Sequence, residues 1–306
     1  MSGSVCAVVL AAGAGLRLRP LTAAVPKALC PVGNVALLDR ALARLAAHGL
    51  AGPGLVAVNA CYLADQIVEH VGARAQLSVE RGEPLGTAGG VANLRDWIAG
   101  RAVLVGNADA FLAPAADLAG GDQHPTVAGG DLRPLLDGWD GEQVRVLTVA
   151  AEPGGRVEFV EARAKGLADR RRPGDPQAWR FAGFSLLPWS RVADLPVRPT
   201  ELVRAVWRPA EADGRLVLVP YRGTYIDCGT PADYLRANRH AAGDGSLVAV
   251  DAHVTGPIEQ AVIGARAQVA GRVTRGVVWP DGEVGAGEHL IDAVRVGRAL
   301  TVPAQA

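Results

Sequence analysis

Short apolar runs alternate with helical repeats along the first two thirds of the chain. Residues 6–10, 55–58 and 102–105 are apolar runs with the length of buried strands. Apolar residues recur at helical spacing over 36–47 and again over 64–71. Strands that alternate with helices in this way predict an α/β fold with a mostly parallel, Rossmann-like sheet sandwiched by helices.

The same patterns continue toward residue 242. They predict strands at 76–80, 144–149, 181–187 and 216–221, and helices at 86–97, 132–139, 200–207 and from 231 onward. Functional sites in parallel sheets lie at the carboxyl ends of the strands. We therefore expect the loops that follow Leu10, Val79 and Val105 to hold the functional residues.

The pattern changes at about residue 246, where helical periodicity stops. Steps of small and β-branched residues follow, as in 263–268 and 269–274. These steps resemble the hexapeptide repeats of a left-handed β-helix and predict one to three coils, although an ordinary β-rich tail is the alternative. We therefore predict two domains, at 1–242 and 246–306.

The loop after the first strand carries candidate phosphate-binding chemistry. It opens with a turn of small residues, Ala11, Ala12, Gly13, Ala14 and Gly15, and continues to three cations, Arg17, Arg19 and Lys27. Glycines let backbone N–H groups approach a phosphate, and the cations neutralise it. The loop does not match a dinucleotide fingerprint, because Leu18 replaces the third glycine, and the chain has no P-loop motif.

Composition narrows the class of protein. The 31 basic and 31 acidic residues cancel, so bulk charge does not favour nucleic acid or a membrane surface as a partner. No run of eighteen apolar residues occurs, and the four cysteines have no metal-ligand spacing, so we expect a cytoplasmic protein. Only Lys27 and Lys165 among the basic residues are lysines. Because ammonium and guanidinium groups are not interchangeable, this bias favours a chemical role for Lys27.

Two acidic residues and a candidate helix-capping residue follow strands that are predicted further along the chain. Asp109 follows the strand at 102–105, where an acid is well placed to hold Mg²⁺, although a turn or helix cap is the ordinary role of such a residue. Near the end of the α/β region, Asp227 precedes Thr230 and Pro231. Thr230 is predicted to cap the next helix, with Pro231 in its first turn, and Asp227 is not needed for that cap.

Four ordered motifs resemble those of the sugar-phosphate nucleotidylyltransferases. The first comprises Gly13, Gly15, Arg17, Pro20, Leu21, Thr22, Pro26, Lys27, Pro31 and Val32. The others are E-P-L-G-T-A-G from Glu83, the acid at Asp109, and Y-x-D-x-G-T-P-x-D-Y around Asp227. Departures from the family pattern are Leu16, Ala28, Ala36 and Ala108, and none of them removes a charged group.

The resemblance implies substrates, a cofactor and residue roles. The substrates would be a nucleoside triphosphate and a sugar 1-phosphate, with Mg²⁺ on Asp109 and Asp227. Arg17 would bind the triphosphate, and Lys27 would hold the α-phosphate and the sugar phosphate together. The nucleoside would lie on Leu10, Ala11, Ala12, Gly13, Gly15, Gly86 and Thr87, with Glu80 or Glu83 at a base edge. The sugar would lie beside Gly183 and Glu161, although the family's Glu-Lys-Pro segment is absent here.

Substrate identity and rival functions remain open at this level. Guanylyl transfer to mannose 1-phosphate is the first expectation, because the E-P-L-G-T-A-G loop and a β-helical tail often accompany it. Uridylyl or thymidylyl transfer to a glucose or amino-sugar 1-phosphate is the alternative. In such enzymes the tail serves packing, assembly as a homo-oligomer, or regulation. A catalytically silent regulatory subunit is a rival from another class, but such proteins tend to lose the loop lysine or the acids.

Overall fold

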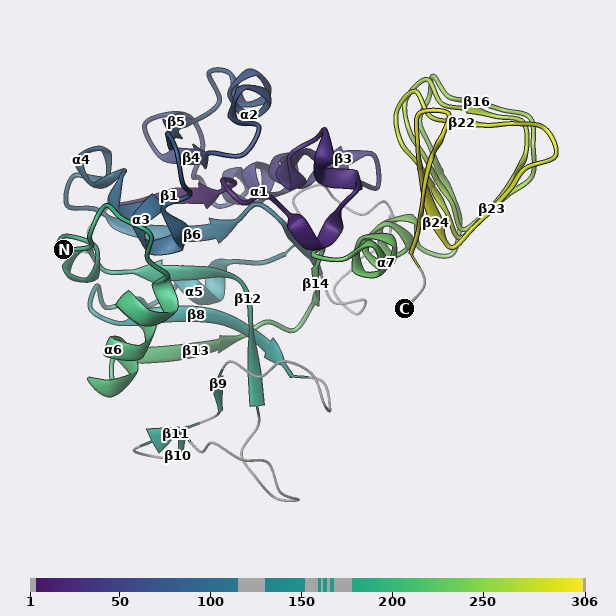
Figure 1. The fold of residues 1–306 in the computed structure, drawn as a ribbon. Coiled ribbons are helices and arrows are strands. Elements are labelled where there is room, and N and C mark those ends of the chain that lie inside the picture. The colour runs from purple at the N-terminus through teal and green to yellow at the C-terminus, as the bar shows by residue number, and fades with distance from the viewer. Residues whose placement is uncertain are drawn as a thin grey trace.

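The computed structural model describes residues 4–114, 130–151, 159–160, 162–163, 166–167 and 178–304. An α/β body and a β-helical body lie at opposite ends of the molecule, with helix α7 between them (Figure 1). The predicted fold class, a Rossmann-like sheet with a β-helical tail, is confirmed.

The central sheet has the strand order β13-β8-β12-β6-β1-β4-β5, with β9 paired to β12. Strands β1, β4, β5 and β6 run parallel, β12 runs antiparallel to β6 and β8, and β13 is parallel to β8. Their bounds are β1 Val5–Leu10, β4 Val56–Ala60, β5 Gln76–Val79, β6 Ala102–Asn107, β8 Val144–Ala150, β9 Phe159–Val160, β12 Ala178–Leu187 and β13 Leu216–Pro220.

Strand β1 is buried on both faces, as its continuous apolar run predicted. Ala7 and Val9 belong to a core that includes α1 (Leu37–Ala46), α2 (Ala64–Val71) and α5 (Arg133–Leu136). Cys6 and Val8 belong to the core on the other face, with α3 (Gly86–Ala92), α4 (Arg95–Ile98) and α6 (Arg208–Ala212). The predicted helix at 86–97 is therefore two helices, and the segment before α6 is a π-helix at Val203–Trp207.

Short elements complete the α/β body. These are 3-10 turns at Leu16–Leu18, Leu21–Ala23, Lys27–Leu29 and Trp189–Arg191, and strand pairs β2 (Pro31–Val32) with β3 (Val35–Ala36), β7 (Ala110–Ala113) with β14 (Thr224–Asp227), and β10 (Ala162–Arg163) with β11 (Gly166–Leu167). The pairing of β7 with β14 matters most for function. It brings the segment after Asp109 against the segment that ends at Asp227.

Helix α7 (Pro231–Ala242) begins as the sequence predicted. The Thr230 hydroxyl accepts a hydrogen bond from the Asp233 backbone N–H at 3.1 Å and donates to the Asp233 carboxylate at 2.8 Å. Pro231 occupies the first turn, where it sacrifices no helical hydrogen bond. This cap fixes the chain direction immediately after Asp227.

The tail is a β-helix of three parallel sheets. Their orders are β15-β18-β21-β24, β16-β19-β22 and β17-β20-β23, and β25 pairs antiparallel with β24. The strands are β15 Leu247–Val248, β16 His253–Val254, β17 Ile258–Glu259, β18 Val262–Ile263, β19 Gln268–Val269, β20 Arg272–Thr274, β21 Val277–Val278, β22 Glu283–Val284, β23 His289–Ile291, β24 Ala293–Val296 and β25 Leu300–Pro303.

The hexapeptide period expected for these coils is wrong. Leu247 pairs with Val262, and Val262 pairs with Val277, so successive coils are 15 residues apart, and the step from Val277 to Val294 is 17 residues. Three hexapeptides would need 18 residues. Corner residues in the left-handed conformation, such as Arg266 with φ 56°, turn the chain in fewer residues.

The β-helix contacts the α/β body through α7 and the hairpin of β2 and β3. The indole N–H of Trp279 donates to the Tyr234 hydroxyl at 2.9 Å, and that hydroxyl donates to the carbonyl of Pro31. The Asn34 side-chain amide donates to the carbonyl of Ile263 at 2.9 Å.

No helix in the part of the chain that the structure describes is long and apolar enough to cross a membrane.

Candidate active site

The loop after β1 folds back so that its glycine turn lies against Lys27. Gly15 has φ 58°, and the Thr22 hydroxyl donates to its carbonyl at 2.8 Å. A Cβ atom at Gly15 would lie 3.0 Å from the Cβ of Lys27, so glycine permits this close approach. At Gly13, by contrast, no atom lies within 4 Å of the position a Cβ would take, and Gly13 lines the cleft.

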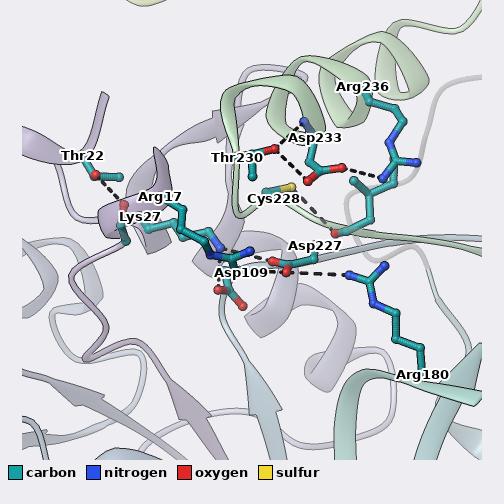
Figure 2. Close-up of polar contacts among 12 residues, drawn as sticks. Arg17, Thr22, Lys27, Asp109, Arg180, Asp227, Cys228, Thr230, Asp233 and Arg236 are labelled. Carbon is teal, nitrogen blue, oxygen red and sulfur yellow. Dashed lines mark hydrogen bonds and ion pairs between the residues drawn. The ribbon is translucent and has the colours of Figure 1, made fainter. Parts of the chain in front are cut away.

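Lys27 lies between the two candidate metal acids (Figure 2). Its ammonium nitrogen is 2.7 Å from Asp109 Oδ2 and 3.4 Å from Asp227 Oδ1. Arg17 reaches Asp227 Oδ2 at 3.3 Å, and Arg180 lies 3.7 Å from the same oxygen. Three cations and two carboxylates therefore meet at the carboxyl end of the sheet.

Burial and charge act in opposite directions on this cluster. Burial lowers the pKa of Lys27, which is 7% exposed, but the carboxylates of Asp109 and Asp227 outweigh that effect and raise the pKa above its ordinary value. Burial also raises the pKa of Asp227, but Lys27 and Arg17 together bring it below its ordinary value. Lys27 and Asp227 are consequently both charged at neutral pH.

Three adjoining cavities surround this charged centre, and Asp109 lines all of them. We name each cavity after the ligand that the sequence resemblance implies for it. The first, the phosphate cavity, is lined by the glycine loop with Arg17 and Lys27. The second, the base cavity, is lined by Leu10, Ala12, Gly13, Asn59, Pro84, Gly86, Thr87, Asn107, Asp109 and Glu201. The third, the sugar cavity, is lined by Arg17, Thr87, Val105, Asn107, Asp109, Arg180, Phe181, Ser185, Glu201, Leu202, Val203, Trp207, Tyr225 and Asp227.

Gly86 and Thr87 hold one wall of the base cavity. Gly86 has φ 70°, and a Cβ there would lie 2.7 Å from the carbonyl oxygen of Thr200. The Thr87 hydroxyl donates to the Glu201 carboxylate at 2.7 Å and accepts from the Leu202 N–H at 2.8 Å. Glycine at 86 therefore allows helix α3 to begin in contact with the segment that carries Glu201.

Glu80 lies behind the residues that line the base cavity, and not at the base edge where it was expected. It is 5% exposed, and its carboxylate accepts from the Asn59 side-chain amide at 2.7 Å and from the Leu85 N–H at 2.8 Å. Asn59 in turn accepts from the Ala11 N–H at 2.7 Å. Hydrogen bonds from Glu80 through Asn59 to Ala11 therefore connect the segment after β5 to the loop after β1. Glu80 itself is not a lining residue of the base cavity.

Gly183 brings β12 close to the acid. It has φ 84° within a register shift between Phe181 and Ser185, and a Cβ there would lie 2.5 Å from the Cβ of Ala110. Because Ala110 follows Asp109, only glycine allows this strand to pass so close to the charged centre. Gly183 itself is not a lining residue of the sugar cavity. The other expected sugar contact, Glu161, lies outside the described residues.

Arg180, Asn107, Glu201 and Tyr225 line these cavities and were not identified from the sequence. Asn107 is the second residue after the predicted strand at 102–105 and could have been found by position alone. Position alone would not have identified Arg180 or Glu201, since Arg180 precedes the predicted strand at 181–187 and Glu201 lies near the start of the predicted helix at 200–207.

The donor set of the cluster fits a Mg²⁺ ion held with substrate phosphates. Within the described ranges no group of three or more His, Cys, Asp or Glu side chains is arranged to hold a metal. Mg²⁺, however, is usually bound by one or two carboxylates together with phosphates and water. Asp109 and Asp227 already share one cation, the Lys27 ammonium, so they are close enough to share another.

Comparison with known proteins agrees with this arrangement. Residues 6–119 match the family model described as nucleotidyl transferase. An N-acetylmuramate alpha-1-phosphate uridylyltransferase of Caulobacter vibrioides is 30% identical over 249 residues, which cover 77% of this chain and 96% of that protein. A rice protein named as a mannose-1-phosphate guanylyltransferase is 27% identical over 97% of this chain and 81% of its own length.

A mannose-1-phosphate guanylyltransferase of Mycobacterium tuberculosis is 27% identical over 76% of this chain, which spans 63% of that relative. A solved structure from Bacillus anthracis, named as a glucose-1-phosphate thymidylyltransferase, superposes with a TM-score of 0.62 over 78% of this chain and 95% of its own, at 18% identity.

The relative that is 30% identical and the matching family model identify a nucleotidyl transferase. The chain belongs to the sugar-phosphate nucleotidylyltransferase family, and its reaction class is transfer of a nucleotidyl group to a sugar 1-phosphate.

Proposed function

We propose that this enzyme transfers a guanylyl group from GTP to mannose 1-phosphate, with Mg²⁺ held by Asp109 and Asp227. The observation that carries the residue assignment is the position of Lys27 between these two acids, where the three cavities meet. The guanylyl assignment is supported by the rice guanylyltransferase, which matches the chain through the β-helical tail.

The reaction is an in-line displacement at phosphorus. An oxygen of the sugar 1-phosphate attacks the α-phosphorus of the triphosphate, and the bond from that phosphorus to the bridging oxygen of the β-phosphate breaks. Pyrophosphate leaves with the bonding electron pair, and no proton transfer is required. The transition state is crowded with anionic oxygens, so positioning and charge neutralisation account for most of the catalysis.

Each charged side chain has a place in this reaction. Lys27, which is buried between two acids, holds the α-phosphate and the sugar phosphate together. Arg17, which is more exposed, binds the triphosphate and then the departing pyrophosphate. Mg²⁺, when bound, supplies further neutralisation of the phosphate oxygens. Gly86 and Thr87 with the backbone of 10–15 hold the nucleoside.

The uridylyltransferase relative supports a second candidate function. That relative is named for N-acetylmuramate 1-phosphate, and the match covers 96% of its length. Uridylyl transfer to a sugar acid 1-phosphate is therefore the alternative to guanylyl transfer.

Pyrophosphate release with Mg²⁺ tests both candidates. GTP, UTP, dTTP, ATP and CTP are each paired with mannose, glucose, N-acetylglucosamine and N-acetylmuramate 1-phosphates. We expect one preferred pair, activity that EDTA abolishes and Mg²⁺ restores, and a loss of at least about 10²-fold in kcat for Asp109→Asn. If the folded protein binds nucleotide but releases no pyrophosphate from any pair, the catalytically silent regulatory subunit replaces this proposal.

A further inference from the structure

We propose that Arg180 is a substrate-binding residue, which binds an anionic oxygen group of the sugar substrate. This inference rests on the proposed function, since it concerns the acceptor side of the same site. Arg180 lies on β12, and it is a lining residue of the sugar cavity, whereas the phosphate and base cavities do not include it. Its side chain is 30% exposed, so it faces the cavity with part of its guanidinium accessible.

The contact of Arg180 with Asp227 leaves the guanidinium able to bind a ligand. Figure 2 shows Arg180 approaching Asp227 from the side opposite Lys27. The distance from Arg180 Nη2 to Asp227 Oδ2 is 3.7 Å, which is longer than a hydrogen bond. Asp227 already accepts from Arg17 and Lys27 at 3.3 and 3.4 Å, so Arg180 is the most distant of its three cations.

The cations of the cluster are divided between the cavities. Arg17, Lys27 and Arg180 share Asp109 and Asp227, whereas the third carboxylate that lines the sugar cavity, Glu201, accepts from the Thr87 hydroxyl at 2.7 Å. Arg17 is exposed toward the phosphate cavity as well as the sugar cavity, and Lys27 is buried between the acids. Of the three cations, Arg180 is the one that lines the sugar cavity and neither of the other two cavities.

The geometry of Arg180 suits planar anion recognition. The guanidinium carbon lies over the Tyr225 ring, 5.2 Å from its centroid, which holds the fork in one orientation. A fixed guanidinium fork binds phosphate or carboxylate oxygens through two parallel hydrogen bonds. The register shift at Phe181–Ser185 and the close approach of Gly183 to Ala110 bring this part of β12 to the acids.

The anionic oxygens could come from two parts of the acceptor. One source is the 1-phosphate, which every acceptor carries, and the other is a carboxylate on the sugar, as in N-acetylmuramate. Among the described residues that line the sugar cavity, the cations are Arg17 and Arg180.

The test compares Arg180→Ala, Arg180→Lys and the control Arg191→Ala. Arg191 is also a part-exposed arginine paired with an aspartate, Asp213 at 2.5 Å, but it lies outside the three cavities. For each variant, KM is measured for the nucleotide, for mannose 1-phosphate and for N-acetylmuramate 1-phosphate. Affinity for each sugar 1-phosphate is also measured by titration calorimetry, which does not require turnover.

We expect Arg180→Ala to raise KM and Kd for the sugar substrate by about 10- to 100-fold, and to leave the nucleotide KM within about twofold. Arg180→Lys should recover part of the affinity, and Arg191→Ala should match the wild type. An equal effect on both sugars assigns Arg180 to the 1-phosphate, and an effect confined to N-acetylmuramate 1-phosphate assigns it to the carboxylate.

The inference is overturned if Arg180→Ala leaves both sugar affinities unchanged, or if it weakens nucleotide and sugar binding equally, as a support for Asp227 would. Wild-type protein that binds a sugar 1-phosphate without turnover overturns the proposed function alone. Wild-type protein that binds none of these sugars overturns both.

Discussion

Paired arginines and aspartates occur in two regions of this protein, and their geometry differs. On the β-helix, Arg266 meets Asp281 through two contacts of 2.7 Å, and Arg275 meets Asp292 through contacts of 2.7 and 2.6 Å. Each of these arginines presents its guanidinium fork to one carboxylate on the following coil. Such bidentate pairs satisfy both partners.

In the active-site cleft, three cations surround Asp227 at 3.3, 3.4 and 3.7 Å, and Asp109 has one of them at 2.7 Å. None of these contacts is bidentate. The pairs on the β-helix are complete without a ligand, whereas Asp227 is shared by three cations at longer distances and lines an open cavity. The ion pairs of the β-helix therefore join neighbouring coils of the fold, whereas the charged groups of the cleft are placed to bind a substrate.

The largest effect is expected from Lys27, because it joins both acids and the phosphate cavity. Lys27→Met keeps most of the side-chain volume and removes the charge, and it should lower kcat by at least about 10²-fold. Lys27→Arg should not restore activity, because a planar guanidinium does not replace the compact ammonium that contacts both acids. Steady-state kinetics with the preferred substrate pair measures both.

Circular dichroism and thermal unfolding serve as controls for folding of the Lys27 variants. Activity of Lys27→Met within tenfold of the wild type would show that the cleft cations are as dispensable as those of the β-helix.

A smaller effect is expected from the glycine that brings β12 to the acids. Gly183→Ala places a methyl group 2.5 Å from the Cβ of Ala110 and forces an unfavourable backbone conformation at φ 84°. We expect it to lower the free energy of unfolding by about 1–3 kcal/mol. We also expect it to raise the sugar KM, since β12 carries Arg180.

Gly214→Ala is the matched control for this prediction. Gly214 has φ 67°, and no atom lies within 4 Å of the position of its Cβ, so this variant tests backbone strain without a steric clash. Chemical denaturation and steady-state kinetics of both variants separate the effect of backbone strain from the effect of the steric clash with Ala110. Equal loss of stability and unchanged sugar KM in both would mean that the approach of β12 to Ala110 has no role in substrate binding.

The sequence predicted the parts of this site that local pattern controls. The buried run before the glycine turn, the acid after β6 and the cap at Thr230 each follow from neighbouring residues, and the structure brings Lys27, Asp109 and Asp227 together. The strands before Lys27 and Asp109 end at the same edge of the central sheet, and the pairing of β14 with β7 brings Asp227 to that edge.

The rest depended on contacts that no local pattern encodes. Arg180 reaches the acids only because β12 shifts register and passes close to Ala110. Glu80 was expected at a base edge, but Asn59 and Leu85 occupy its carboxylate. In the tail, small-residue steps indicated a β-helix, but the length of a coil depends on corner conformations such as that of Arg266.

The smallest effect is expected from the β-helix pairs. Arg266→Ala and Arg275→Ala remove cations whose partners lie on the β-helix surface, far along the chain from the cleft. Water and salt screen exposed pairs of this kind, so each variant should change Tm by no more than about 3 °C. Because neither cation reaches the three cavities, kcat and both KM values should match the wild type. The double variant, which combines Arg266→Ala and Arg275→Ala, tests this expectation more strictly than either single variant. If it lost activity while Tm stayed unchanged, the β-helix charges would influence the cleft, and the separation between the two regions would fail.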